Sequence, residues 1–186
     1  MRVGSDRFSV GDQVFDRWFP DEVPRIRGWR VGDEVAALVA AEGPPARRED
    51  ALAEWVFAVD DPGGNERRVV LWAQLIKDRV VTLHARFTSR DRMDVDAAWR
   101  PIKDHLDKLH GQPAKQVSGL LKLVWTVADE PNPTVISGCR FREDSGLQVL
   151  DVVQTLKDGA RLHVGGRSGP TSPPAGGRPP PRAPGA

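Results

Sequence analysis

The segment from Arg67 to Phe87, RRVVLWAQLIKDRVVTLHARF, constrains the fold more than any other part of the sequence. Apolar and polar side chains alternate along both halves of this segment, as they do in β-strands that bury one face. Lys77 and Asp78 lie between the halves and predict a two-residue hairpin turn, although neither is the glycine that such turns prefer. Together with the alternating segment Glu54–Asp60, the two halves predict a three-stranded antiparallel meander.

This alternation also assigns side chains to the two faces of the predicted meander. On the last strand one face carries Val81, Leu83, Ala85 and Phe87, and the opposite face carries Val80, Thr82, His84 and Arg86. Trp72 and Gln74 of the preceding strand are expected on the His84 face. That face is either a binding surface formed by Trp72, Gln74, His84 and Arg86 or the solvated side of a sheet that is covered on one side only. The positive charge of Arg86 is expected to keep His84 neutral, so that His84 is able to act as a base.

A central amphipathic helix is predicted after the meander. Its apolar stripe consists of residues at helical spacing: Trp99, Ile102, Leu106 and Leu109. Because proline suits the first turn of a helix and glycine the residue after its end, we expect a helix from Pro101 to His110. A separate turn is expected to begin near Asp94. The apolar stripe requires a sheet to pack on.

Strand patterns return after this helix and complete the predicted fold. Four segments are separated by turn sequences: GLLKLVWTVA, TVISGCRFR, LQVLDVVQTL and ARLHV. We therefore expect a single α+β domain from Asp6 to Val164, with a mainly antiparallel sheet of two meanders and about seven strands packed by the central helix. From Gly165 to Ala186 the chain is rich in proline and glycine and has no large apolar side chain, which predicts a disordered tail.

The N-terminal third gives weaker signals. VGDQV at Val10–Val14 recurs as VGDEV at Val31–Val35, and two Gly-Asp turns at this spacing could bracket a hairpin, or the recurrence is a coincidence of two common turns. After Asp33, an alanine-rich segment ends at Gly43 and predicts a short helix that Asp33 caps.

Several classes of function are disfavoured by what the sequence lacks. It has no phosphate-binding loop, dinucleotide-binding turn, nucleophile elbow or zinc-protease helix, and no cofactor is predicted. The chain has 27 basic and 26 acidic residues, so a dedicated nucleic-acid binder is not expected. No apolar run is long enough for a signal peptide or a membrane span, and we expect a cytoplasmic location. Cys139 is the only cysteine, and its strand pattern predicts a buried, inert thiol.

The sequence predicts no metal site. His105 and His110 are five residues apart, which places them on different sides of the predicted helix, where we expect both to face solvent. Asp91, Asp94 and Asp96 precede the helix but lack the glycine and the further oxygen ligands of a calcium loop. Helix capping is therefore the preferred role for Asp94 and Asp96.

The six tryptophans separate into two groups. Predicted core anchors lie on apolar faces: Trp55, Trp99 and Trp125. Candidates for a partner-binding surface are less clearly placed by pattern: Trp18, Trp29 and Trp72. These features favour a non-enzymatic binding or adaptor domain that engages a protein partner. The alternative is a small-molecule-binding or hydrolytic domain that uses the sheet face around His84 and Arg86, and the oligomeric state stays open.

Overall fold

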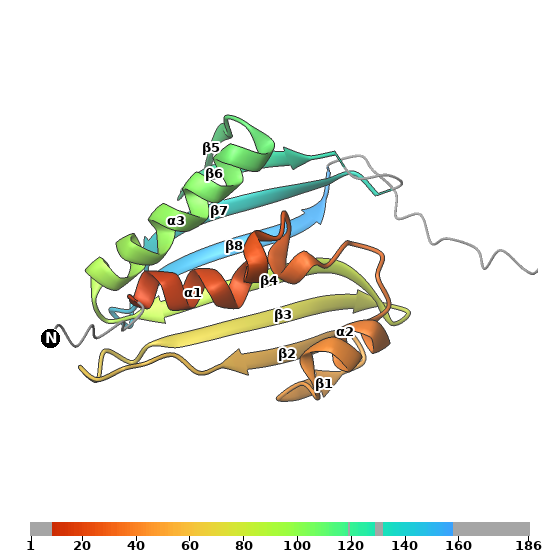
Figure 1. Cartoon of the computed structure of the whole chain (residues 1–186), viewed down its shortest axis with the longest axis horizontal. Helices are drawn as coiled ribbons and strands as arrows, with labels where there is room; N and C mark the ends of the chain where they lie inside the picture. Colours follow the sequence, from red (N-terminus) through yellow and green to blue (C-terminus); the bar gives the residue numbers. More distant parts are fainter. Residues whose placement is uncertain (1–8, 119, 129–131, 158–186) are drawn as a thin grey trace, which may run out of the picture.

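One antiparallel sheet of eight strands forms the centre of the computed structural model, which describes residues 9–118, 120–128 and 132–157 (Figure 1). The strands lie in the order β1-β2-β3-β4-β8-β7-β6-β5. Their bounds are β1 Arg47–Glu49, β2 Leu52–Phe57, β3 Arg68–Ile76, β4 Arg79–Ser89, β5 Ala114–Ser118, β6 Leu120–Val127, β7 Thr134–Arg142 and β8 Gln148–Leu156. The helices are α1 Val10–Trp18, α2 Val35–Glu42 and α3 Arg92–His110, with short 3₁₀ helices η1 Pro20–Glu22 and η2 Ile26–Gly28.

The predicted fold class is confirmed, with eight strands rather than about seven. Strands β1–β4 form one meander, β5–β8 form the other, and the pairing of β4 with β8 joins them. The sequence analysis missed β1 and β5, because these short edge strands have the mainly polar sequences RRE and AKQVS and show no apolar alternation. The predicted strand ARLHV and the predicted tail 165–186 lie outside the described residues.

The predicted hairpin turn is confirmed, but the strand after it contains a bulge. Lys77 and Asp78 both have positive φ, 49° and 58°, as a two-residue turn of the primed type requires. Between Gln74 and Leu75 the register shifts, and Leu75 pairs with Val80. Val80 is therefore fully buried on the core side, so its predicted place on the His84 face was wrong.

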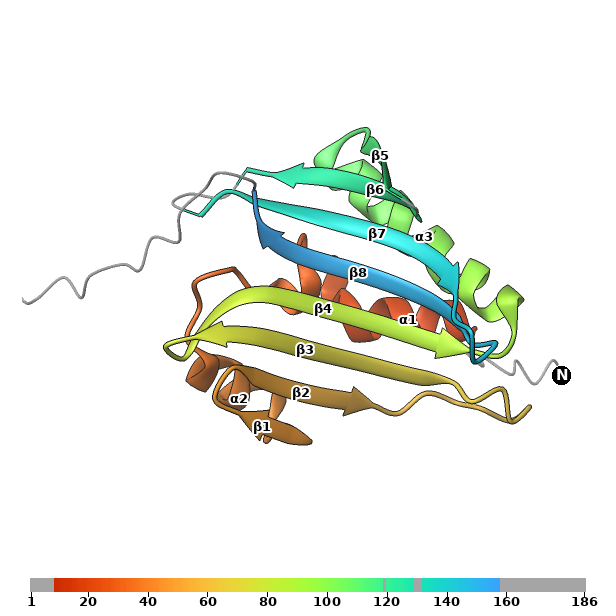
Figure 2. The ribbon, with the colours of Figure 1, turned by 180° about the vertical axis from the view of Figure 1, so that it is seen from behind.

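In the described part of the chain, helices cover only one face of the sheet. Figure 1 shows α1, α2 and α3 in front of the strands, and Figure 2 shows the opposite face, which no helix of the described part covers. We call this opposite face the open face; it carries Trp72, His84, Arg86 and Asp151. On the helix-covered face lie the buried core anchors predicted from the sequence: Trp55, Trp99 and Trp125.

Two of the three predicted surface tryptophans do not lie on a free surface. Trp18 is fully buried at the end of α1, so its assignment to a partner surface was wrong. Trp29 packs against the core, and its indole N–H donates to Glu42 at 3.1 Å. Trp72 is the only one of the three on the open face.

α3 continues through Pro101 for 19 residues, so the predicted start of the helix at Pro101 was wrong. Proline lacks the N–H that would bind the carbonyl of Ala97 four residues earlier. Gly11 of α1 packs against this carbonyl so closely that a Cβ on Gly11 would lie 2.5 Å from the Ala97 oxygen. Packing between α1 and α3 therefore occupies the space beside the interrupted hydrogen bond.

α1 occupies the place where a hairpin was considered. Ser9 and Asp12 form a reciprocal capping box that starts this helix within the VGDQV segment. The short helix predicted after Asp33 is confirmed as α2, and it ends at Gly43 with φ 83°. Asp33 does not cap α2; its carboxylate accepts the N–H of Arg30 at 2.8 Å. No helix in the described part of the chain is both long and apolar enough to cross a membrane.

Candidate functional site

Trp72 on the open face contacts one aromatic neighbour, His84, and one cationic neighbour, Arg86. The register of β3 and β4 places Trp72 opposite His84, and their rings stack at 4.8 Å with an interplanar angle of 10°. The guanidinium carbon of Arg86 lies 5.5 Å from the Trp72 ring centre and 5.9 Å from that of Phe141 on β7. Trp72 thus contacts two of the other three predicted site residues, His84 and Arg86. Gln74 lies on the same face, but its side chain is exposed and makes no hydrogen bond with another described residue.

A salt bridge from β8 fixes the Arg86 side chain. Asp151 lies opposite Arg86 in the register of β4 and β8, and its two oxygens accept from Arg86 Nε and Nη2, each at 2.7 Å. Such a bidentate pair sets both the position and the plane of the guanidinium. Glu143 lies 3.5 Å from Arg86 Nη1. Hydrogen bonding to Asp151 raises the pKa of Arg86, so its charge is permanent at this site.

Three neighbours of Arg86 were not predicted from the sequence: Asp151, Glu143 and Phe141. An acid in the middle of the apolar strand LQVLDVVQTL was a usable signal, because an aspartate between buried residues requires a partner. It could not identify Arg86 as that partner, since 65 residues separate the two and the β4–β8 pairing is not encoded locally. Phe141 and Glu143 become neighbours of Arg86 only after β7 has paired with β8.

The direction of the pKa shift of His84 agrees with the expected neutral state of its ring. Burial lowers the pKa of His84, the positive charge of Arg86 lowers it further, and Asp151 opposes both effects. In the described part of the chain, no hydroxyl or thiol group is hydrogen-bonded to the His84 ring. Cys139 is buried, and burial raises the pKa of its thiol, with Asp151 adding to the effect. The geometry therefore provides a neutral imidazole stacked on an indole, without an activated nucleophile beside it.

A shallow hollow of about 330 Å³ adjoins Trp72 on the open face. Its lining combines apolar and charged residues of β2, β3 and β4: Leu52, Glu54, Arg68, Val70, Trp72 and Arg86. His84 and Gln74 do not line it. The helices of the N-terminal segment, α1 and α2, lie on the other face of the sheet (Figure 2). The hollow consequently opens away from the described helices.

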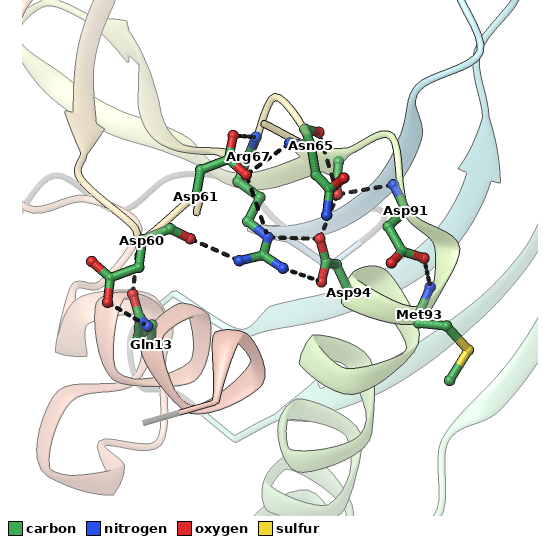
Figure 3. A network of polar contacts seen from close by, with 9 residues as sticks. Gln13, Asp60, Asp61, Asn65, Arg67, Asp91, Met93 and Asp94 are labelled. Atoms are coloured by element: carbon green, nitrogen blue, oxygen red, sulfur yellow. Dashed lines mark hydrogen bonds and ion pairs between the residues drawn. The ribbon is translucent and has the colours of Figure 1, made fainter. Parts of the chain in front are cut away.

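Two of the three aspartates at the start of α3, Asp91 and Asp94, belong to a polar network rather than to a cation site (Figure 3). Asp94 is buried, and its oxygens accept from Arg67 Nε and Nη2, each at 2.7 Å, and from the Ser89 hydroxyl at 2.7 Å. Asp91 caps α3 by accepting the N–H of Met93 at 2.8 Å. The capping role predicted for Asp94 therefore belongs to Asp91, and no metal-binding group of three or more ligands occurs among the described residues.

Electrostatic effects at Asp94 favour its charged form. Burial raises the pKa of this carboxyl, but the hydrogen bonds from Arg67 and Ser89 lower it more strongly, so that the net pKa lies below the usual value. Asp96, the third aspartate, pairs instead with Arg140 of β7 and with Arg92. All three carboxylates thus have structural partners within the protein.

The two helix histidines are structural as well. His105 is buried, and its Nε2 atom is hydrogen-bonded to the carbonyl of Val23 at 2.8 Å. His110 Nε2 is hydrogen-bonded to the carbonyl of Pro24 at 2.9 Å. Both residues fasten the chain between η1 and η2 to α3, so the prediction of two solvent-facing histidines was wrong.

Comparison of the chain with models of protein families, with curated proteins and with solved structures gives no match. The candidate site is therefore defined by geometry: the Trp72–His84 stack, the Arg86–Asp151 salt bridge and the adjoining hollow, all on the open face.

Proposed function

We propose that the protein is a binding domain that engages a protein partner through the open face, with Trp72 at the centre of the contact. The observation that carries this proposal is the fixed indole of Trp72, which stacks on His84 and lies beside Arg86. Tryptophan and arginine are enriched among residues that dominate binding energy at protein interfaces. A side chain that is already held in one position loses little conformational entropy when a partner covers it.

The dimensions of the open face also support this proposal. Eight strands spaced about 4.8 Å apart, the longer ones about nine residues long with a rise of about 3.3 Å per residue, give a face on the order of 1,000 Å². A standard protein interface uses about 800 Å² on each partner. Apolar side chains that could contribute to the contact lie next to Trp72, and Val56 on β2 is 46% exposed.

The proposal is tested by affinity capture from a lysate of the source cells, comparing wild type with a Trp72→Asp variant. Leu109→Asp is the matched control, because Leu109 is an exposed apolar residue of α3 on the opposite side of the sheet. We expect a partner that binds wild type and Leu109→Asp equally well and is lost with Trp72→Asp. Circular dichroism establishes that both variants are folded. A partner that binds all three proteins alike would contradict the proposed surface.

A second candidate function is the binding of a small molecule in the hollow beside Trp72. The hollow of about 330 Å³ lies in the lower part of the range of about 300–1,000 Å³ that is usual for small-ligand sites. Trp72 and Arg86 both line it, so an aromatic or anionic ligand would find a complementary wall. Titration of tryptophan fluorescence with a metabolite panel, in wild type and Trp72→Phe, tests this candidate. A saturable change that disappears in the variant supports it, and no response in wild type refutes it.

A further inference from the structure

A larger hollow lies on the helix-covered side of the sheet, between the first half of α3 and strands β6 and β7. Its volume is about 500 Å³, well inside the range of about 300–1,000 Å³ that small-ligand sites occupy. We call it the α3–β7 groove and define it by Trp99 of α3, Leu121 and Leu123 of β6, and Arg140 and Arg142 of β7. It is separate from the Trp72 surface, because the sheet lies between them.

The depth of this groove depends on Gly138. The Trp99 ring packs over this position so closely that a Cβ on Gly138 would lie 2.7 Å from two ring atoms. The absence of a side chain therefore lets Trp99 lie against β7, where the indole forms one wall of the groove. Val95, one helical turn before Trp99, extends the same apolar wall.

The floor of the groove is apolar and accessible. Leu121 is 56% exposed, and Leu123 beside it is half-buried. Both point to the helix-covered face, as the register of β6 with β7 requires. Accessible leucines in a concave site gain free energy when an apolar ligand covers them. The floor therefore favours a ligand with an apolar body.

Positive charge exceeds negative charge around this floor. Three arginines line the groove, Arg92, Arg140 and Arg142, together with a single acid, Asp96. Asp96 pairs with Arg140 and lies 3.5 Å from Arg92, and the Arg140 guanidinium lies 5.7 Å from the Trp99 ring centre. The Arg142 guanidinium is exposed and has no hydrogen bond or ion pair with any described residue. Arg142 is thus available to an anion, while Asp96 holds two other arginines in place.

We propose that the α3–β7 groove binds a small amphipathic carboxylate, with its apolar body on Leu121, Leu123 and Trp99 and its carboxylate on Arg142. A planar guanidinium is suited to this role because it donates two parallel hydrogen bonds to a carboxylate. The unpaired positive charge of Arg142 and the apolar floor lie in one concave site. A site with both features favours an amphipathic carboxylate over a neutral hydrocarbon, which lacks the charge, and over a small inorganic anion, which lacks the apolar body. This binding site is independent of the proposed protein-binding surface.

Isothermal titration calorimetry with defined probes tests this proposal on the whole 186-residue chain. Decanoate and 1-naphthoate carry both features, 1-naphthamide lacks the charge, and acetate lacks the apolar body. We expect saturable binding of at least one of the first two probes. We expect the amide and acetate to bind about tenfold more weakly or worse, because a charge-assisted hydrogen bond contributes about that factor or more. The proposal would be overturned if neither decanoate nor 1-naphthoate showed saturable binding. It would also be overturned if 1-naphthamide bound with the same affinity as 1-naphthoate.

Two pairs of variants locate the site. Arg142→Met removes the proposed anchor, and we expect it to weaken binding of the carboxylate by about 10- to 100-fold. Arg100→Met is its control, because Arg100 is an exposed arginine of α3 that does not line the groove. Leu121→Asp places an acid in the floor and should abolish binding. Leu120→Asp, on the other face of the same strand, should leave it unchanged.

Each result from these variants decides the proposal. Unchanged binding in Arg142→Met, or loss of binding in Arg100→Met to the same degree, would overturn the role of the charged anchor. Retained binding in Leu121→Asp would place the ligand elsewhere. Circular dichroism and the unfolding midpoint of each variant show that a loss of binding is not a loss of folding.

Discussion

His84 lies in a setting where two effects favour the neutral ring and one opposes them. Burial and Arg86 lower the pKa of His84, while Asp151 raises it. We therefore predict that the His84 pKa, measured by NMR titration of the ring protons, lies below the usual value of about 6.5. Asp151→Asn should lower it further, because that substitution removes the one acid that favours the imidazolium. Asp144→Asn is the control, because Asp144 is an exposed acid that does not contribute to the pKa shift of His84. A rise in Asp151→Asn would contradict the assignment.

This lowered pKa makes the stability of the protein depend on pH in a defined direction. The unfolded chain binds a proton at His84 more tightly than the folded protein does. The contribution of neutral His84 to the free energy of unfolding is therefore complete above about pH 6.5 and is lost as pH falls through the lower folded-state pKa. A His84→Phe variant keeps an aromatic ring against Trp72 but cannot bind a proton. Urea unfolding between about pH 7.5 and 5 should show a smaller loss of stability for the variant than for wild type, and parallel pH curves would refute this.

At the scale of single residues, the sequence predicts which side chains share a strand face but not which strands become neighbours. Trp72, His84 and Arg86 could be placed together because a two-residue turn fixes the β3–β4 register. Asp151 could not be assigned to Arg86, since strand alternation carries no information about a partner 65 residues away. The prediction of faces also depends on regular pairing, and the bulge at Val81 of β4, opposite Gln74 and Leu75, moved Val80 to the core.

Among the secondary-structure elements, the contact of α3 with the β2–β3 connection depends on the buried pair Arg67 and Asp94. Their side chains are 15% and 7% exposed. Removing one partner of a buried ion pair leaves the other charge uncompensated. We predict that Arg67→Met lowers the free energy of unfolding by about 3 kcal/mol. The adjacent Arg68→Met should change it by less than about 0.5 kcal/mol, because Arg68 is 59% exposed and lies 3.7 Å from Glu54. Urea unfolding at pH 7 measures both, and equal effects would contradict a role for the Asp94 pair.

The elements also show where local rules fail. Proline normally excludes the preceding residue from a helix, which is why the sequence predicted a start at Pro101. In the structure, the buried stripe from Val95 to Leu106 packs along one continuous axis, and this burial outweighs the lost hydrogen bond at Ala97. The edge strands β1 and β5 form because their neighbours supply hydrogen-bond partners, a cause that their own residues do not reveal.

In the whole molecule, the N-terminal segment fastens the two meanders together at the seam between β4 and β8. Gln154 near the end of β8 is fully buried, accepts the N–H of Ile26 at 3.3 Å and donates to the carbonyl of Trp29 at 3.0 Å. These bonds hold η2 across the seam. Because both meanders share this cover and one continuous sheet, we expect the described part of the chain to unfold as a single cooperative unit.

Cooperative unfolding is tested with 5-fluorotryptophan, whose fluorine resonances distinguish Trp55 in the first meander from Trp125 in the second. We predict that both signals disappear with the same urea midpoint. Gln154→Met should lower the free energy of unfolding by about 2 kcal/mol, since it leaves two backbone groups without hydrogen-bond partners. Both urea midpoints should therefore decrease by the same amount. Gln116→Met on the exposed strand β5 is the control and should have little effect. Different midpoints for the two tryptophans, or a shift confined to Trp125, would mean that the meanders fold separately and that the N-terminal segment does not couple them.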